Sequence, residues 1–359
     1  MKPNLLLIDD TQEHLDELEG ALQGVLGPEE AEIRRWRPSP GDKPKQHFDG
    51  LVNNDTELVV TDHDLTKGQT GLFGSTIVAW CQAKAIPVGD FSRVNRSNLP
   101  KEPNQYEIRI PDDPPQAANF IAGAFRGFKE IRAALDANIV LLRKKRSPVS
   151  VLAAILERPT EESRFAQYGG RVGAANAALF DLVKAETDAP EDQKRRLLSY
   201  VVGHLLLNVI LRFPGPLLSK KALAAYLAIE ESEIVKAEKF FADAKYIGPF
   251  SSIEQFYWLT DVDHALEKMI QKLPPEAAAD TPGQMNREAV ENALGAKLNR
   301  HACPRCGGLN GGFLCPFTER TVCQLTNCSV ASNGWIPPGA RLCRIEKDFY
   351  DEWGPMLGF

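Results

Sequence analysis

The stretch Thr56–Leu72, TELVVTDHDLTKGQTGL, decides the fold of the N-terminal part of this chain. It begins with an apolar run that stops at Asp62, and a glycine-containing loop follows. A second apolar run, Leu5–Ile8, also ends in acids, Asp9 and Asp10. In an open α/β sheet, buried parallel strands read as continuous apolar runs, and ligands bind at their carboxyl ends. The two runs therefore predict two parallel strands whose ends bring three carboxylates to a crevice.

Carboxylates gathered at two strand ends predict a metal site. Three negative charges would repel one another unless a divalent cation lay among them, and oxygen ligands suit magnesium. The candidate ligands are Asp9, Asp10 and Asp62, and we add Asp64, which lies two residues beyond Asp62.

This arrangement resembles the receiver domain of bacterial response regulators, and the resemblance covers residues 1–125. It implies that Asp9 and Asp10 are the acidic pair after the first strand and that Asp62 is the phosphoacceptor after the third. It also implies a fourth strand at Ile86–Ser92, with Ser92 as the switch residue.

Two positions depart from the family's pattern. The fifth strand would be Tyr106–Pro111, where the family has a lysine shortly before a proline, and Arg109 is the nearest cation here. Thr66 replaces the proline that usually follows the phosphoacceptor strand.

Helical periodicity between the strands supports the same fold. Apolar residues recur at helical spacing in Glu13–Gly27, Gly74–Ala85 and Gln116–Leu135. Strands that alternate with helices predict a doubly wound parallel α/β sheet. We expect this receiver-like domain to span residues 1–135.

Composition limits the classes of function. The chain has 359 residues, which predicts two or three domains, and its net charge of −6 gives no general reason to bind nucleic acid. It shows no apolar stretch of membrane-spanning length and no signal peptide, so we expect a cytoplasmic protein without membrane contact. Seven cysteines in such a chain favour metal ligands over disulfides.

The middle region, residues 136–271, is predicted to be mostly helical. Within it, residues 215–262 predict a helix at Lys220–Ile229 capped by Ser219, a second helix ending near Ala244, and two short strands. This order resembles a winged helix-turn-helix.

DNA binding by this module is disfavoured. Between Glu230 and Lys245 there are five acidic residues against three lysines, and such a surface repels phosphate. We expect contacts with proteins, and weak binding or none to duplex DNA at physiological salt.

The C-terminal region carries a second metal signal. Cys303 and Cys306 form a CxxC motif before two glycines, and Cys323 and Cys328 are the preferred second pair. Three further residues compete for those places: Cys315, Cys343 and His301. Four thiolates suit structural zinc, a four-cysteine iron–sulfur cluster is the chemical alternative, and free buried cysteines are the third interpretation.

The boundaries of this region come from a turn-rich stretch. Lys272–Gly283, KLPPEAAADTPG, predicts a linker, which we extend over residues 272–294, and a cysteine-rich domain over 295–359. We therefore expect that loss of the metal unfolds the cysteine-rich domain alone.

These features predict a signalling protein. A sensor histidine kinase or another phosphodonor would phosphorylate Asp62, and the modification would control protein contacts of the helical and zinc domains. The sequence shows no other catalytic motif. The alternatives are a receiver-derived scaffold subunit that is not phosphorylated and a winged-helix transcription regulator.

Overall fold

The structure is a computed structural model that describes residues 2–91, 106–138, 147–168, 191–274, 281–309, 311–331 and 336–354. Contacts divide the chain into two compact units. The first comprises Met1–Leu156, Ala174–Asn208 and Gly248–Ile253. The second comprises Glu157–Gly173, Val209–Ile247 and Glu254–Phe359.

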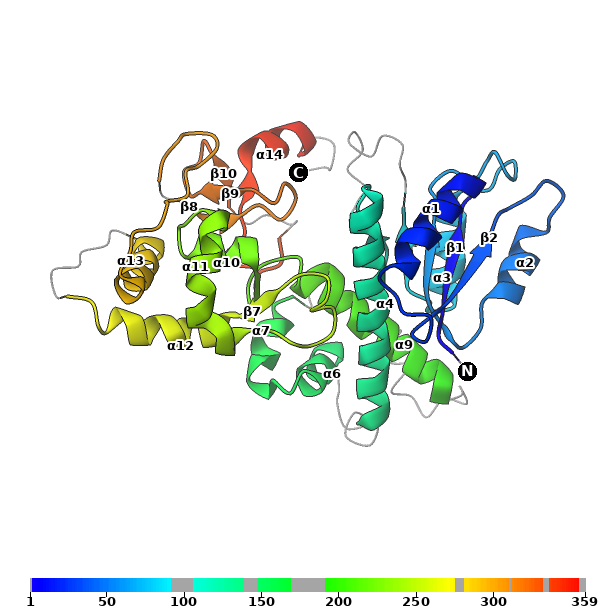
Figure 1. Cartoon of the computed structure of the whole chain (residues 1–359), viewed down its shortest axis with the longest axis horizontal. Coiled ribbons are helices and arrows are strands. Elements are labelled where there is room, and N and C mark those ends of the chain that lie inside the picture. The colour runs from blue at the N-terminus through cyan, green and yellow to red at the C-terminus, as the bar shows by residue number, and fades with distance from the viewer. Residues whose placement is uncertain are drawn as a thin grey trace. The chain divides into compact units, whose positions relative to one another are not determined.

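The first unit contains a parallel sheet with the strand order β2-β1-β3-β4-β5 (Figure 1). The strands are β1 (Asn4–Ile8), β2 (Glu32–Trp36), β3 (Thr56–Thr61), β4 (Val88–Asp90) and β5 (Ile108–Arg109). Every pairing in this sheet is parallel. The predicted doubly wound α/β fold is confirmed, and its strand order is that of the receiver fold.

Helices cover both faces of this sheet. They are α1 (Gln12–Gln23), α2 (Pro44–Leu51), α3 (Gly74–Ala83) and α4 (Pro114–Ala137). Two further helices of this unit, α6 (Pro148–Ile155) and α9 (Glu191–His204), pack against α4 and against each other. Helices α1 and α4 pack against each other, and α4 also contacts β3. On the other face, Phe48 of α2 and Trp80 of α3 have ring centroids 5.5 Å apart. Because β1 and β3 are covered on both sides, their apolar residues are buried on both faces.

One strand and one helix of this unit were missed by the sequence analysis. The sequence analysis names neither β2, which ends at Trp36, nor α2, which begins at Pro44. β2 is an edge strand with the sequence EIRRW, and only Trp36 is buried. Its charged residues hide the apolar pattern that identifies a central strand.

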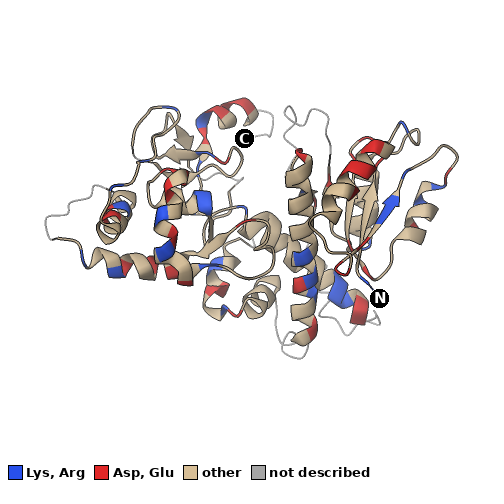
Figure 2. Cartoon of the chain, viewed as in Figure 1, with Lys and Arg blue, Asp and Glu red and all other residues tan. Residues whose placement is uncertain are grey.

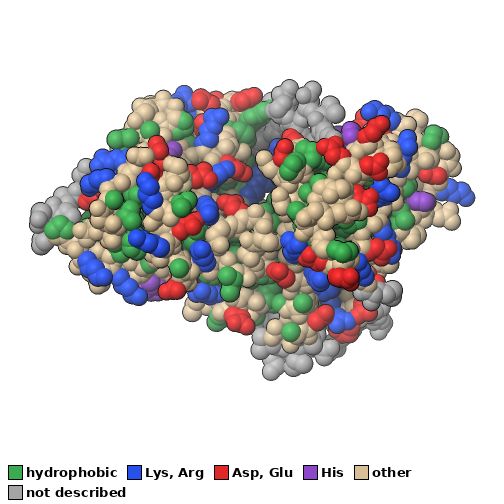
Figure 3. Space-filling view, viewed as in Figure 1, with side chains coloured by type: hydrophobic (Ala, Val, Ile, Leu, Met, Phe, Trp, Pro, Cys, Tyr) green, Lys and Arg blue, Asp and Glu red, His purple; other side chains and the backbone are tan. Residues whose placement is uncertain are grey.

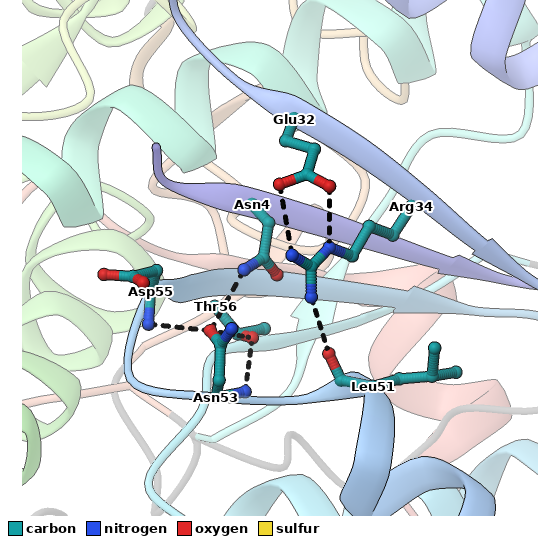
Figure 4. A network of polar contacts seen from close by, with 7 residues as sticks. All are labelled: Asn4, Glu32, Arg34, Leu51, Asn53, Asp55 and Thr56. Atoms are coloured by element: carbon teal, nitrogen blue, oxygen red, sulfur yellow. Dashed lines mark hydrogen bonds and ion pairs between the residues drawn. The ribbon is translucent and has the colours of Figure 1, made fainter. Parts of the chain in front are cut away.

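A polar network holds the amino-terminal ends of β1, β2 and β3 (Figure 4). The Asn4 side chain donates to Asn53 Oδ1 at 3.1 Å, and the Asn53 amide donates to Thr56 Oγ1 at 3.0 Å. Arg34 pairs with Glu32 at 3.0 Å and donates to the Leu51 carbonyl at 3.2 Å. These bonds fix the strands at the end opposite the carboxylates.

Contacts between aromatic rings pack α9 against the rest of the first unit. Tyr106 and Tyr200 stack with centroids 5.2 Å apart, and the His204 ring lies 4.4 Å from that of Tyr200. His204 is fully buried, and its Nδ1 lies 2.7 Å from the Tyr200 carbonyl oxygen. Burial lowers the pKa of His204 to about 4, so the ring is neutral and structural.

The second unit consists of short helices and small antiparallel sheets. Within the π-helical segment η4 (Leu205–Ile210), the chain passes from the first unit to the second. The helices of the second unit are η2 (Pro159–Glu161), α7 (Glu162–Ala166), α10 (Lys220–Tyr226), η5 (Glu231–Glu233), α11 (Ile234–Ala237), η6 (Glu238–Ala244), α12 (Leu259–Ile270), α13 (Pro282–Leu294) and α14 (Lys347–Trp353). Its strands are β6 (Leu217–Ser219), β7 (Phe256–Trp258), β8 (Gly311–Leu314), β9 (Thr321–Cys323), β10 (Ser329–Val330) and β11 (Ile345–Glu346).

The helix-turn-helix region starts as its sequence predicts. Ser219 Oγ accepts a hydrogen bond from the Ala222 amide at 3.2 Å and caps α10. Strand β7 pairs with β6, which precedes α10 and was not predicted. The second helix is divided into η5, α11 and η6.

Charges of opposite sign are mixed over this region. Lys220 pairs with Glu238 at 2.6 Å, and Lys236 pairs with Glu233 at 2.8 Å. Acidic and basic residues are likewise interspersed along α12 and α13 (Figure 2). The space-filling view shows the same mixture of side chains over the face it presents (Figure 3).

The structure differs from the predicted linker over residues 272–294. Pro282–Leu294 is helix α13, which Thr281 caps and which packs against α12. Its buried residues include Asn286, Arg287 and Glu291. The extension of the linker beyond the turn-rich stretch is therefore wrong, because α13 belongs to the core of the second unit.

Candidate metal centres

The first candidate centre is an acidic cluster of Asp9, Asp10 and Asp62. One carboxylate oxygen of each lies within 4.8 Å of the others. The Ile8–Thr61 register places the ends of β1 and β3 side by side, and the Asp62 amide donates to the Ile8 carbonyl at 2.9 Å. The sheet itself therefore creates this cluster.

Burial and mutual repulsion make the cluster electrostatically unfavourable without a cation. Burial raises the pKa of Asp62 to about 6, and the nearby charges of Asp9, Asp10 and Asp90 add to the rise. Burial also raises the pKa of Asp9, against the opposing effects of the Thr11 amide and His14. A divalent cation would remove this repulsion, and three hard oxygen donors suit magnesium.

Hydrogen bonds from neighbouring loops fix two of the carboxylates. The Thr11 amide donates to Asp9 Oδ1 at 2.7 Å. The amides of Lys67 and Gly68 donate to Asp10 Oδ2 at 2.9 and 3.1 Å. The orientation of both side chains is thus set before a metal binds.

The first residue of α3 packs closely against the backbone of Asp62. Gly74 is the first residue of α3, and a Cβ atom there would overlap the Asp62 carbonyl oxygen. Only glycine lets the start of α3 lie this close to the end of β3.

Asp64, which was also predicted as a ligand, does not belong to the cluster. Asp64 is exposed, and its carboxylate accepts hydrogen bonds from the Thr66 amide and hydroxyl at 3.0 and 2.6 Å. Arg109 is exposed on β5, where it is in register with Asp90. Ser92 lies outside the described residues.

The sequence analysis did not identify Asp90 and His63 as neighbours of the acidic cluster. Asp90 is buried in β4, and its Oδ2 lies 3.7 Å from Nδ1 of the half-exposed His63. A carboxylate inside a short apolar strand was the available signal, because a buried charge needs a partner.

The second candidate centre is the quartet of Cys303, Cys306, Cys323 and Cys328, whose sulfur atoms lie within 4.8 Å of one another. The Sγ atoms of Cys306 and Cys323 are 3.8 Å apart. The structure thus brings together the two preferred pairs. Three of these cysteines are buried and Cys306 is exposed.

Two tight turns place the sulfurs. In the first, the Cys303 amide donates to the Gly308 carbonyl, the Gly307 amide donates to the Cys303 carbonyl, and the Gly308 amide reaches Cys306 Sγ at 3.4 Å. In the second, the Cys328 amide donates to the Leu325 carbonyl at 2.9 Å. This turn accommodates the four residues between the second pair.

The thiol pKa values differ within the quartet. Backbone amides of residues 305, 306 and 323 outweigh the effect of burial and lower the pKa of Cys303 to about 6. Burial and the neighbouring thiols raise the pKa values of Cys323 and Cys328. Four thiolates can therefore coexist here only around a cation, and a closed tetrahedral sulfur site suits zinc.

The competing ligands lie outside the quartet. Cys315 and Cys343 are buried, and Cys343 Sγ lies 3.9 Å from the Pro214 carbonyl oxygen. His301 Nε2 lies 3.2 Å from the Thr321 carbonyl oxygen.

The segment before Cys303 pairs with the turn between α10 and η5. The backbones of Ile229 and Arg300 form an isolated antiparallel β-bridge. Beside it, the Glu230 amide donates to the Asn299 carbonyl at 3.0 Å. The His301 amide donates to the Ala228 carbonyl at 3.3 Å. The cysteine-rich region is therefore part of the second unit and not a separate body behind a linker.

Comparisons with models of protein families, with curated proteins and with solved structures return no match. Among the described residues, no helix is both long and apolar enough to cross a membrane.

Proposed function

We propose that this chain is a response-regulator-like signalling protein whose phosphoacceptor is Asp62. The observation that carries the proposal is the cluster of Asp9, Asp10 and Asp62 at the carboxyl ends of two adjacent parallel strands. The donor is a sensor histidine kinase or another phosphodonor, as the resemblance to receivers implies.

The chemistry assigned to Asp62 is one phosphoryl transfer. A carboxylate oxygen of Asp62 attacks the phosphorus atom, the bond from phosphorus to the donor breaks, and the donor keeps the electron pair. A magnesium ion held by Asp9, Asp10 and Asp62 would supply positive charge to the phosphoryl oxygens. The amides that fix Asp9 and Asp10 keep the ligand side chains in place during the transfer.

The modification would act through charge. A phosphoryl group adds about −1.5 to −2 charge at neutral pH. On Asp62 it would lie beside His63 and the buried Asp90, and so would alter the contact between β3 and β4. We propose that this change controls contacts with partner proteins.

Structural zinc is the companion proposal for the cysteine quartet. Four cysteine ligands leave no open coordination position, so the metal would hold the fold and would not activate water. An iron–sulfur cluster is the alternative that the same ligands allow.

A non-phosphorylated scaffold is the second candidate function. It is favoured by Arg109, which is exposed on β5 and replaces the lysine of the resembled family. A winged-helix transcription regulator is the third candidate, and the pairing of β6 with β7 around α10 supports its shape. The ion pairs of Lys220 and Lys236 with acids argue against DNA as the partner.

Phosphorylation with a small-molecule phosphodonor and magnesium tests the leading proposal. We expect acid-stable, base-labile labelling of the wild type and loss of that labelling in Asp62→Asn. Asp64→Asn is the matched control, because it removes an exposed carboxylate two residues away from Asp62. An unlabelled wild type would favour the scaffold. Equal labelling of both variants would show that a residue other than Asp62 carries the phosphoryl group and would refute the proposal.

A further inference from the structure

One member of the cysteine quartet differs from the others in its access to solvent. All seven cysteines of the chain lie among the described residues, and Cys306 is the only exposed one. Its three companions, Cys303, Cys323 and Cys328, are each 1% exposed. Cys306 lies in the segment between Cys303 and β8, and Leu309 of the same segment is also exposed. A small reagent in solution can therefore reach the Cys306 sulfur directly.

A second sulfur lies next to that of Cys306. The Sγ atoms of Cys306 and Cys323 are 3.8 Å apart. The hairpin of β8 and β9 sets this distance, because Gly311 of β8 is in register with Cys323 at the end of β9. The Ser329 hydroxyl donates to the Cys323 carbonyl at 2.6 Å and fixes the backbone there. The exposed sulfur thus has a buried neighbour already in position.

Cysteines that hold a cation do so as thiolates, and the thiolate is the form that reacts with oxidants. The Gly308 amide reaches Cys306 Sγ at 3.4 Å and would stabilise a negative charge on it. Susceptibility to oxidation follows thiolate character and exposure together. Within the quartet, only Cys306 combines the two.

We propose that Cys306 is an oxidation site for hydrogen peroxide and that the product is a disulfide with Cys323. The Cys306 thiolate attacks one peroxide oxygen, the O–O bond breaks, hydroxide leaves, and Cys306 becomes a sulfenic acid. The Cys323 thiolate then attacks the Cys306 sulfur, the S–S bond forms, and a second hydroxide leaves. The two sulfurs lose two electrons, which reduce the peroxide, and solvent protons convert both hydroxides to water.

The disulfide would dismantle the metal centre. It uses two of the four sulfur ligands, and a closed structural zinc site needs all four. The segment that leads into Cys303 is hydrogen-bonded to the turn between α10 and η5, so this turn should loosen when the metal is lost. The oxidation itself depends on the positions of Cys306 and Cys323 and requires neither phosphorylation of Asp62 nor a particular metal.

Peroxide treatment of the full chain tests the proposal. Elemental analysis first gives the metal content. Hydrogen peroxide is then added below one equivalent, a chromogenic chelator records released zinc, and mass spectrometry of peptides locates the oxidised cysteines. A parallel sample contains dimedone, which traps sulfenic acid. We expect dimedone on Cys306, a disulfide between Cys306 and Cys323 when dimedone is absent, and release of zinc in proportion to the disulfide formed.

Two variants with the same ligand set separate exposure from metal binding. Three cysteines and one histidine also form a structural zinc site. Cys306→His should therefore keep its zinc and should not release it on peroxide treatment, because the exposed thiolate is gone. Cys328→His is the matched control: it retains Cys306 and Cys323 and should release zinc as the wild type does. Equal release from both variants would overturn the proposal.

The map of the wild type decides the proposal even where a variant does not fold. First oxidation at a buried cysteine such as Cys315 or Cys343, or a disulfide without Cys306, would overturn it. A disulfide between Cys303 and Cys306 would overturn the assignment of Cys323 as the partner. A chain without zinc before treatment would refute structural zinc alone, because the first oxidised cysteine would still be located.

Discussion

Loss of the metal at the cysteine quartet should loosen the helix-turn-helix region of the second unit. The perturbation is Cys306→Ser, which removes one ligand from an exposed position and so costs little packing. Two backbone hydrogen bonds, Glu230 to Asn299 and His301 to Ala228, connect the turn after α10 to the segment that leads into Cys303.

The size of the effect follows from the bonds that join the two segments. The Asn299 side chain adds a third bond, to Glu233 Oε1 at 3.1 Å. Each such bond contributes about 1 kcal/mol net, so the three together are worth about 2–3 kcal/mol. Exchange of the Glu230 amide should therefore become roughly 30- to 150-fold faster in the variant.

Hydrogen exchange measured by mass spectrometry is the assay. Peptides that cover residues 226–233 should gain deuterium faster in Cys306→Ser, whereas peptides from β1 and β3 should not change. The control is Cys81→Ala, because Cys81 is buried in the α/β core and lies outside the quartet. Unchanged exchange around Glu230, despite loss of the metal, would refute the coupling and restore the independent domain that the sequence suggested.

Three further predictions concern the two centres. Without metal, the free energy of unfolding should fall by about 1–2 kcal/mol as the pH rises from about 4 to about 6, because burial raises the pKa of Asp62 to about 6 and the folded state therefore holds this proton more tightly than the unfolded state. Urea titrations should show this dependence in the wild type, with a smaller one in Asp62→Asn. Gly74→Ala should destabilise the chain by about 1–3 kcal/mol and weaken magnesium binding, since its methyl group meets the Asp62 carbonyl, whereas Gly50→Ala, in open space on α2, should stabilise it by about 0.5–1 kcal/mol in thermal melts. Elemental analysis should find about one zinc per chain, and Cys303→Ser should lose it, while iron with visible absorbance would identify a cluster.

The parts of the fold that the sequence predicts are those with an unbroken apolar signal. Buried strands such as β1 and β3 have such a signal and end at acids, so the sheet and its acidic edge could be placed before the structure was known. β2 exposes its arginines at the edge of the sheet, and α13 buries polar residues, so both lacked that signal.

The site was predictable as far as it depends on strand ends and motifs. The CxxC pair and the carboxylates at strand ends identify most ligands, because neighbouring parallel strands place their carboxyl ends together. Asp64 follows the same strand, but its carboxylate is held by Thr66, and a local turn of this kind is hard to foresee.

The most direct test of the central claim is the site of phosphorylation. The full chain would be treated with a small-molecule phosphodonor and magnesium, and its peptides would be mapped by mass spectrometry after trapping of the acyl phosphate. The account predicts one phosphoryl group per chain, on Asp62, and none when magnesium is chelated. A chain that gains no phosphoryl group, or gains it on another residue while Asp62 stays unmodified, would contradict it.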